Sequence, residues 1–197
     1  MAVYPISEIL RRISVIRVFR NVALVAIDGP SGAGKSTLAK QLADAGDQTA
    51  VVSGDDFYRP ASDDERRSWS PEEGVRKYFD WERLEQEVLG PLSRTGRCRY
   101  QRYDWSSGKL SEAMQLPNAH VVLVEGVYSF RPELRRYYDF SIMVTTPAAE
   151  RLRRWKERGD PEEQIKRWNA SEELYFESTH PEEAAEMIVQ GSSEIAP

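Results

Sequence analysis

The stretch GPSGAGKS at residues 29–36 decides the fold of this 197-residue chain. It fits the pattern G-x-x-x-x-G-K-[ST], whose small residues let the backbone wrap around a phosphate group. The nearly all-apolar run NVALVAID, residues 21–28, precedes it, and a helical pattern with Leu38, Leu42 and Ala45 on one face follows it. A strand, a glycine-rich turn and a helix in this order predict a phosphate-binding loop.

This loop contains the groups that would hold the phosphates of ATP. Successive backbone N–H groups and the helix N-terminus point at phosphate oxygens, and the lysine reaches the terminal phosphates. We expect Lys35 to be this catalytic lysine and Ser36 to ligate Mg²⁺. The residues expected to bind ATP are Gly29, Ser31, Gly32, Ala33, Gly34, Lys35, Ser36 and Thr37. A glycine-rich turn without a ligand is the alternative, but the flanking strand and helix disfavour it.

The rest of the chain alternates short apolar runs with helical patterns. Four further strands are expected, at residues 50–53, 121–125, 140–144 and 185–189. Helices are expected at residues 7–14, about 80–93, 148–158 and about 161–177. Strands separated by helices predict an α/β fold with a parallel sheet.

The domain organisation expected from this pattern is simple. With 40% hydrophobic residues, the chain can form one substantial core. We expect an N-terminal helix or arm at 1–20, one domain at 21–190 and a polar tail at 191–197. Within the domain, a polar surface excursion with little periodicity covers 56–76 on the substrate side, and a short lid covers 148–160.

Composition excludes several classes of protein. The formal net charge of −5 gives no general attraction to nucleic acid. The single cysteine, Cys98, excludes an internal disulfide, and His120 and His180 lack the spacing of a zinc site. Apolar runs are strand-sized, so no membrane partner is expected. We expect a soluble, cytoplasmic protein and leave open whether it forms a homo-oligomer.

The N-terminus allows one alternative for localisation. Arg11, Arg12, Arg17 and Arg20 are compatible with an arginine-rich transit peptide. However, Glu8 is unusual in such a peptide, and the first core strand follows immediately.

Carboxylates follow two of the expected strands. Asp55 and Asp56 come directly after the strand at 50–53, and Glu125 ends the strand VVLVE at 121–125. Because ligands bind beyond the carboxyl ends of parallel strands, we expect these acids near the loop. One aspartate can take the proton of an acceptor hydroxyl, and Glu125 can join the magnesium site. A helix-capping aspartate pair and a solvated glutamate are the alternatives.

A basic cluster occupies the helix expected at 148–158. Its members are Arg151, Arg153, Arg154, Lys156 and Arg158. Their mutual repulsion is costly unless anions or acidic side chains lie nearby, so a lid that closes over phosphates would use them. A solvated basic face is the alternative.

These features favour a small-molecule kinase. The chain lacks the N-K-x-D motif of guanine-nucleotide switches and a transporter signature, and it is too short for a large mechanical ATPase. A non-catalytic NTP-binding regulator remains the alternative from another class. If the chain is a kinase, Asp55, Glu125 and Ser36 should converge on one cleft beside Lys35.

The assembled motifs resemble the uridine kinase branch of P-loop kinases, which includes phosphoribulokinase and bacterial pantothenate kinase. Matching segments occur in order: GPSGAGKST at 29–37, SGDDFY at 53–58, FDWERL at 79–84, YDW at 103–105, VVLVEGVYSF at 121–130 and RLRRWKERGD at 151–160. They cover most of residues 22–160.

That resemblance implies ATP as the donor, a nucleoside 5′-hydroxyl as the acceptor, and a five-stranded parallel sheet in the order 2-3-1-4-5. It implies that Asp55 is the general base and that Ser36 and Glu125 form the magnesium site. It also implies that Tyr103 lies in the substrate pocket, with Tyr58 of the SGDDFY segment beside Asp55. Arg151, Arg154 and Arg158 are then the lid arginines.

The chain departs from this family where the base would bind. No histidine stands shortly after Tyr103, Asp104 and Trp105, where the sequence reads Ser-Ser-Gly, and the N-F-D-H-P substrate segment is absent. The acceptor therefore stays open between a nucleoside, pantothenate, a sugar and a ribosyl compound. A tryptophan can stack on a base or simply pack in the core, and the candidates are Trp69, Trp81 and Trp105.

Overall fold

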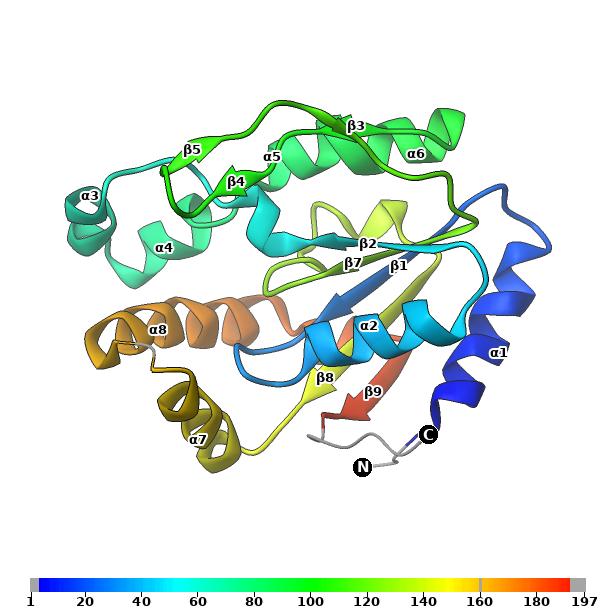
Figure 1. Ribbon diagram of the computed structural model, residues 1–197. Helices are drawn as coiled ribbons and strands as arrows, with labels where there is room; N and C mark the ends of the chain where they lie inside the picture. The colour runs from blue at the N-terminus through cyan, green and yellow to red at the C-terminus, as the bar shows by residue number, and fades with distance from the viewer. Residues whose placement is uncertain (1–3, 160, 192–197) are drawn as a thin grey trace.

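The computed structural model describes residues 4–159 and 161–191. Its centre is a five-stranded parallel sheet (Figure 1). The strands are β1 (Ala23–Asp28), β2 (Thr49–Ser53), β7 (Val121–Glu125), β8 (Phe140–Thr145) and β9 (Met187–Gln190). They lie in the order β2-β7-β1-β8-β9, which is 2-3-1-4-5 when these five strands are numbered along the chain. The predicted α/β P-loop kinase fold and strand order are confirmed.

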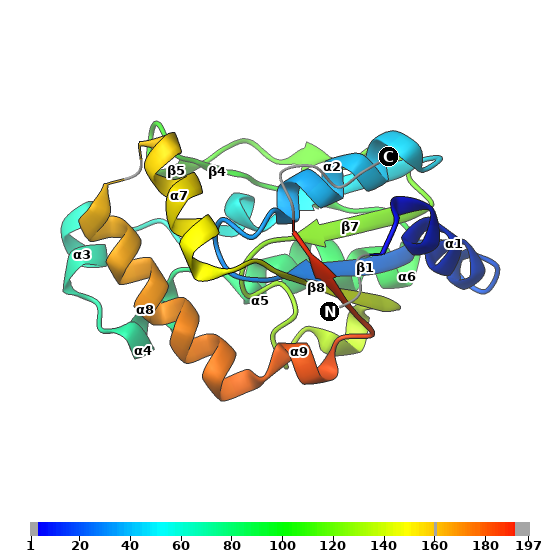
Figure 2. The ribbon, with the colours of Figure 1, turned by 90° about the horizontal axis from the view of Figure 1, so that it is seen from below.

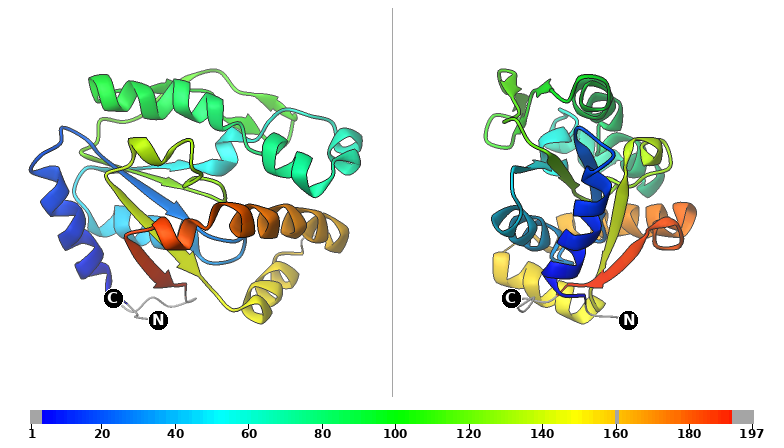
Figure 3. Two further views of the ribbon diagram at one scale, coloured as in Figure 1. Left: turned by 180° about the vertical axis from the view of Figure 1, so that it is seen from behind. Right: turned by 90° about the vertical axis from the view of Figure 1, so that its right-hand side faces the viewer.

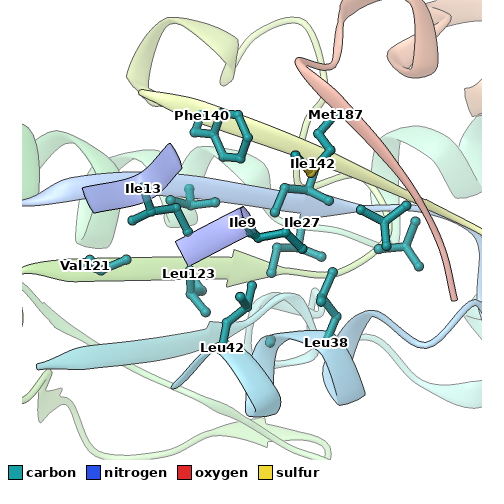
Figure 4. Close-up of a cluster of buried hydrophobic side chains, with 14 of the residues drawn as sticks. Ile9, Ile13, Ile27, Leu38, Leu42, Val121, Leu123, Phe140, Ile142 and Met187 are labelled. Carbon is teal, nitrogen blue, oxygen red and sulfur yellow. The ribbon is translucent and has the colours of Figure 1, made fainter. Parts of the chain in front are cut away.

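Every second side chain of the strands points to the same face of the sheet, and these side chains form a core there. Helices α1 (Ile6–Arg17) and α2 (Lys35–Ala45) cover this face. Figure 4 shows Ile27, Leu123 and Ile142 of the strands packed against side chains of the two helices. Successive residues of a strand point to opposite faces, so Val122 and Val124, the neighbours of Leu123, belong to the other core.

The opposite face carries the second core. Leu24, Val122 and Val124 pack there against the segment of helix that covers residues 81–95, and against Tyr175 of α8 (Glu162–Thr179). The edge-on view shows helices on both sides of the sheet (Figure 3). Burial on both faces explains why the run that forms β1 is almost purely apolar.

The helix predicted at about 80–93 exists, but a wider turn interrupts it. It consists of α5 (Trp81–Leu84), the π-helical turn η2 (Glu85–Leu89) and α6 (Gly90–Thr95). The N–H of Gly90 bonds to the carbonyl of Glu85, and Pro91 has no N–H with which to continue the α-helical pattern. The interruption therefore has a local cause in the sequence.

The polar excursion is more regular than its lack of periodicity indicates. It contains the 3₁₀ turn η1 (Gly54–Phe57) and the short helices α3 (Asp63–Ser68) and α4 (Pro71–Lys77). Each short helix begins with a capping box, in which a serine and the glutamate three residues later bond to each other's backbone N–H. The serine and glutamate spacing of these capping boxes is readable in the sequence, although the stretch has little periodicity.

Two small antiparallel ladders were not predicted. β3 (Arg99–Tyr100) pairs with β6 (Met114–Gln115), and β4 (Tyr103–Asp104) pairs with β5 (Lys109–Leu110). These ladders are too short to give a sequence pattern of their own.

The remaining elements complete the chain around the sheet. They are η3 (Arg135–Tyr137), α7 (Ala148–Arg158) and α9 (Pro181–Ala184). α7 and α8 lie side by side, next to the end of the sheet at which β1 stops (Figures 1 and 2). The predicted tail at 191–197 falls outside the described residues except for Gly191.

Candidate functional site

Residues 29–34 form a tight loop between β1 and α2, and Lys35 and Ser36 begin the helix. Gly29 and Gly34 have φ values of 147° and 100°, which favour glycine. A Cβ atom at Gly29 would lie 2.1 Å from the carbonyl oxygen of Val144, so a larger residue does not fit there. Because α2 begins at Lys35, the free N–H groups of its first turn face the loop. The loop thus has the backbone geometry of an anion site.

Glu125 lies beside this loop because β7 is the neighbour of both β1 and β2. In the strand register it is the partner of Ile27 on one side and of Ser53 on the other. The hydroxyls of Ser36 and Ser53 donate to its two carboxylate oxygens at 3.1 and 3.0 Å. Burial raises the pKa of Glu125, and the positive charge of Lys35 opposes this effect.

The two neighbouring aspartates point to different environments. Asp55 lines the cavity that also contains Lys35 and Glu125. Asp56 instead accepts a hydrogen bond of 3.4 Å from the Tyr100 hydroxyl and pairs with Arg102 at 3.3 Å. Of the two candidate bases, Asp55 is therefore the one that faces the cavity.

The cavity has a volume of about 690 Å³ and two chemically different walls. The first, which we call the P-loop wall, contains Ser31, Gly32, Gly34, Lys35, Ser36, Thr37 and Glu125. The second, which we call the aromatic wall, contains Tyr58, Tyr78, Phe79, Trp105, Tyr128 and Trp168. Asp55 lines the same cavity.

The rings of the aromatic wall contact one another around Tyr58. Its ring centroid lies 4.6 Å from that of Trp105, 5.8 Å from Tyr78 and 6.3 Å from Trp168. Burial raises the pKa of Tyr58 well above its ordinary value, so its hydroxyl stays protonated. The wall is a largely apolar surface built from flat side chains.

The other predicted substrate residues lie behind this wall or away from it. Tyr103 is not among the residues that line the cavity; its ring lies 5.9 Å from that of Tyr58, and its hydroxyl accepts from Arg66 at 2.7 Å. Trp69 contacts Tyr78, and Trp81 lies beneath the guanidinium of Arg131. Of the three tryptophans considered from the sequence, only Trp105 lines the cavity.

The predicted lid helix lies over the loop and contacts its backbone. Arg154 donates to the carbonyl of Gly32 at 2.9 Å, and Arg151 donates to the carbonyl of Ser31 at 3.4 Å. Arg154 and Arg158 line the cavity, together with Arg153, which belongs to the predicted basic cluster but not to the three lid arginines that the family resemblance implies.

Repulsion between the lid arginines is reduced within the helix itself. Arg153 and Arg154 both pair with Glu150, at 2.6 and 3.0 Å. Arg151 is not among the cavity-lining residues, and its guanidinium lies over the ring of Trp155. Arg151, Arg153 and Arg154 are thus each held by contacts with other groups of the protein.

A buried carboxylate fixes the start of the loop. Asp28 accepts from the N–H groups of Gly29 and Phe130 at 2.6 and 2.9 Å, and from the Tyr175 hydroxyl at 2.7 Å. Burial raises the pKa of Asp28 to about 6, although these hydrogen bonds favour its charged form. Asp28 joins β1, the segment after β7 and helix α8 at one point.

Sequence reasoning missed five aromatic residues and two acids that line the cavity. The aromatic residues are Tyr78, Phe79, Tyr128, Trp155 and Trp168, and the acids are Glu157 and Glu172. Trp168 and Glu172 are four residues apart on α8, so helical spacing places them on one face. Nothing in the sequence indicated that this face meets the P-loop.

No site held entirely by protein ligands is evident for a metal ion. Across residues 4–159 and 161–191, no three His, Cys, Asp or Glu side chains form a group suited to a metal ion. Within the same ranges, no helix has the length and apolarity needed to cross a membrane.

Comparison with known proteins assigns a family. A family model described as an AAA domain matches residues 25–177. Uridine-cytidine kinase C of Dictyostelium discoideum is 26% identical over 127 residues, which are 64% of this chain and 27% of that protein. The uridine kinase of Borrelia duttonii (strain Ly) is 26% identical over 139 residues, which are 70% of this chain and 67% of that protein. The chain thus spans about a quarter of the first relative and two thirds of the second.

Solved structures share the fold at low sequence identity. A "possible uridine kinase" from Bacillus stearothermophilus aligns with a TM-score of 0.67 and 23% identity, covering 92% of this chain and 99% of that one. A protein provisionally described as a fructose transport system kinase, from Silicibacter sp. TM1040, aligns with a TM-score of 0.69 and 22% identity. The alignment covers 94% of this chain and 98% of that one. The chain belongs to the AAA-domain family of P-loop proteins and is uridine kinase-like within it.

Proposed function

We propose that this chain is an ATP- and Mg²⁺-dependent phosphotransferase that acts on a hydroxyl of a small metabolite, namely a nucleoside 5′-hydroxyl. One observation carries the proposal: Asp55 lines the same cavity as Lys35 and Ser36 of the P-loop wall and the rings of the aromatic wall. A nucleotide-binding regulator has no need of a carboxylate there.

The P-loop wall is suited to the donor. Its backbone N–H groups and the N-terminus of α2 would hold the phosphates, and the ammonium group of Lys35 would balance their charge. In the structure Lys35 is buried and donates to the carbonyl of Pro30 at 3.2 Å. Arg154 and Arg158 would stabilise the charge on the transferred group from the lid.

Ser36 and Glu125 have the chemistry of a magnesium site that is completed by a substrate. Mg²⁺ prefers oxygen ligands, keeps several waters and is commonly bound through one or two protein groups plus phosphate oxygens. The Ser36 hydroxyl and the Glu125 carboxylate already lie in contact, and Lys35 adds positive charge beside them. When bound, the ion would neutralise charge on the phosphates.

Asp55 has the position of a general base. A carboxylate next to the acceptor hydroxyl both orients it and takes its proton during transfer. Phosphoryl transfer depends mainly on positioning and charge neutralisation. The P-loop wall would supply both for the phosphates, and Asp55 would add the base for the acceptor hydroxyl.

The aromatic wall supports a nucleoside as the acceptor. Flat bases stack on aromatic side chains, and three or more such rings surround Tyr58. Several sequence relatives are uridine kinases, which agrees with this choice. The residues that read the base in that family are absent here, so the particular base is not part of the proposal.

Acceptors other than nucleosides are the alternatives within the kinases. The structural neighbour from Silicibacter sp. TM1040 is provisionally described as a sugar transport system kinase, although at 22% identity it supports the fold alone. Pantothenate and ribosyl compounds belong to the same group of alternatives. A non-catalytic NTP-binding regulator is the alternative outside the kinases.

An acceptor screen tests the proposal. The purified chain is incubated with ATP and Mg²⁺ and with uridine, cytidine, deoxynucleosides, pantothenate, fructose or ribose, and ADP release is followed. We expect release that depends on at least one nucleoside. Release with pantothenate or a sugar alone would replace the acceptor class, and ATP binding without release in any reaction would favour the regulator.

A further inference from the structure

Glu172 of helix α8 is a buried carboxylate that contacts Ser31, near the start of the phosphate-binding loop. Glu172 is 4% exposed. One of its oxygens accepts from the N–H of Ser31 at 2.8 Å, and the other accepts from the Ser31 hydroxyl. The two residues are 141 positions apart in the sequence, so this contact is made by the fold and not by a local motif.

The paired contact satisfies a carboxylate that would otherwise be costly to bury. An ionised group out of water needs hydrogen bonds and opposite charge. Ser31 supplies two hydrogen bonds, and Lys35 and Arg151 supply positive charge nearby. Since Glu172 lies in the cavity wall beside Ser31 and Lys35, it is part of the site although it belongs to a distant helix.

Two residues of α8 hold the loop at two separate points. The Tyr175 hydroxyl donates to Asp28, immediately before the loop, and Glu172 holds Ser31 within it. One turn earlier on the same helix, Trp168 belongs to the aromatic wall. A single helix therefore connects both walls of the cavity.

We propose that Glu172 is a positioning residue for the donor: through its two hydrogen bonds to Ser31 it fixes the mouth of the P-loop in the conformation that receives ATP. This inference rests on the proposed use of the loop for ATP, but not on the identity of the acceptor. The N–H and the hydroxyl of Ser31 already donate hydrogen bonds to Glu172. The phosphates would therefore be bound by the N–H groups from Gly32 onward. Glu172 thus orders the loop without touching the phosphates.

Direct nucleotide binding to the full chain tests this role, since it needs neither an acceptor nor turnover. The probe is the Mg²⁺ complex of a non-hydrolysable ATP analogue, measured by isothermal titration calorimetry. Glu172→Ala should weaken binding by about tenfold to a hundredfold, because two hydrogen bonds to a charged group are lost. Glu172→Gln should stay within about threefold of the unchanged chain, because its carbonyl can accept from the Ser31 N–H and its NH₂ can donate to the Ser31 hydroxyl.

Two further variants control the interpretation. Glu173→Gln alters the next residue of α8, which is exposed and bonded to Asn169, and should leave binding unchanged. Ser31→Ala removes only the hydroxyl contact and should weaken binding by about threefold to tenfold. Its effect should shrink when Glu172→Ala is already present, because both changes remove the same contact.

Four results would overturn the inference. Unchanged binding by Glu172→Ala would mean that the contact does not position the loop, and tighter binding would mean that the carboxylate competes with the phosphates. Equal weakening by Glu172→Ala and Glu172→Gln would mean that its charge, and not its hydrogen bonds, matters. If Glu172→Ala does not fold, unchanged binding by Ser31→Ala would exclude the contact as a positioning device. An inactive chain that binds the analogue as described would refute the proposed kinase activity and leave the role of Glu172 intact.

Discussion

The P-loop wall and the aromatic wall of the cavity are built in different ways. The P-loop wall comes from one continuous stretch plus Glu125, and the pairing of β1, β7 and β2 fixes their relative positions. The aromatic wall comes from separate segments: Tyr58 follows η1, Tyr78 follows α4, Trp105 follows β4 and Trp168 belongs to α8. Backbone geometry orders the first wall, whereas packing between side chains orders the second.

From this difference we expect the P-loop wall to serve the transfer step and the aromatic wall to select the acceptor. A change in the P-loop wall or at Asp55 should alter the rate of transfer with any acceptor, because every acceptor uses these groups. A change in the aromatic wall should alter which acceptor binds and how tightly, with little effect on ATP. The following variants test that division.

The largest effect is expected at Asp55. Asp55→Asn removes the proposed base and should lower the rate of phosphoryl transfer by about 10²–10⁴-fold while ATP binding stays within about twofold. Steady-state kinetics and calorimetry with the ATP analogue measure the two quantities. Asp56→Asn is the matched control, since Asp56 contacts Tyr100 and Arg102 instead of lining the cavity. Equal loss in both variants, or none in Asp55→Asn, would contradict the assignment.

Lys35 should give the next largest effect. Lys35→Ala removes the positive charge beside the proposed phosphate site and should lower kcat/KM by about 10²–10³-fold with every acceptor tested. Lys40→Ala, an exposed position on the same helix, serves as the control and should leave the kinetics unchanged. A loss of kcat/KM with one acceptor only would contradict the claim that the P-loop wall serves every acceptor equally.

Trp168 tests the aromatic wall. Stacking of a base on an aromatic side chain contributes about 1–3 kcal/mol, so Trp168→Ala should raise the acceptor KM by about 5- to 150-fold. The KM for ATP should change by less than about threefold. Trp81→Phe is the control because Trp81 does not line the cavity. A parallel rise in both KM values would show that Trp168 acts through α8 and the loop.

Tyr175 should affect stability more than catalysis. Tyr175→Phe removes one of three hydrogen bonds to buried Asp28 and should lower the free energy of unfolding by about 1–3 kcal/mol. Urea denaturation at several pH values measures it.

The pH dependence of this loss has a definite sign. Burial raises the pKa of Asp28 to about 6 from 3.8, so the folded state favours the protonated acid. The contribution of Asp28 to stability is therefore present below pH ~4, falls between pH ~4 and ~6, and is lost above. Tyr175 stabilises the charged form, so its removal should cost more at pH 8 than at pH 5. An equal loss at both values would contradict this account.

The sequence predicts the P-loop wall well because its information is local. Residues 29–36 carry their own geometry, and Glu125 and Asp55 stand at strand ends that a parallel sheet brings together. The strand order 2-3-1-4-5 came from the family resemblance and agrees with the structure.

The aromatic wall and Glu172 could not be predicted in this way. Tyr78, Trp105 and Trp168 come from separate segments that gather around the ring of Tyr58 only in the folded chain, and each of them alone resembles an ordinary core residue. In the sequence, Glu172 cannot be distinguished from other glutamates of helices. Its role becomes visible only in the fold, where it accepts a hydrogen bond from Ser31. The two capping boxes at Ser62 and Ser70 were visible signals that were overlooked.

The position of the transferred phosphate tests the central proposal most directly. Phosphorus NMR is recorded on reactions of the chain with ATP, Mg²⁺ and the best nucleoside of the screen, in parallel with its 5′-deoxy analogue. We expect a phosphomonoester signal coupled to the two 5′ protons with the nucleoside, and none with the analogue. Formation of inorganic phosphate alone in both reactions, or a phosphomonoester at another hydroxyl, would contradict transfer to the 5′-hydroxyl.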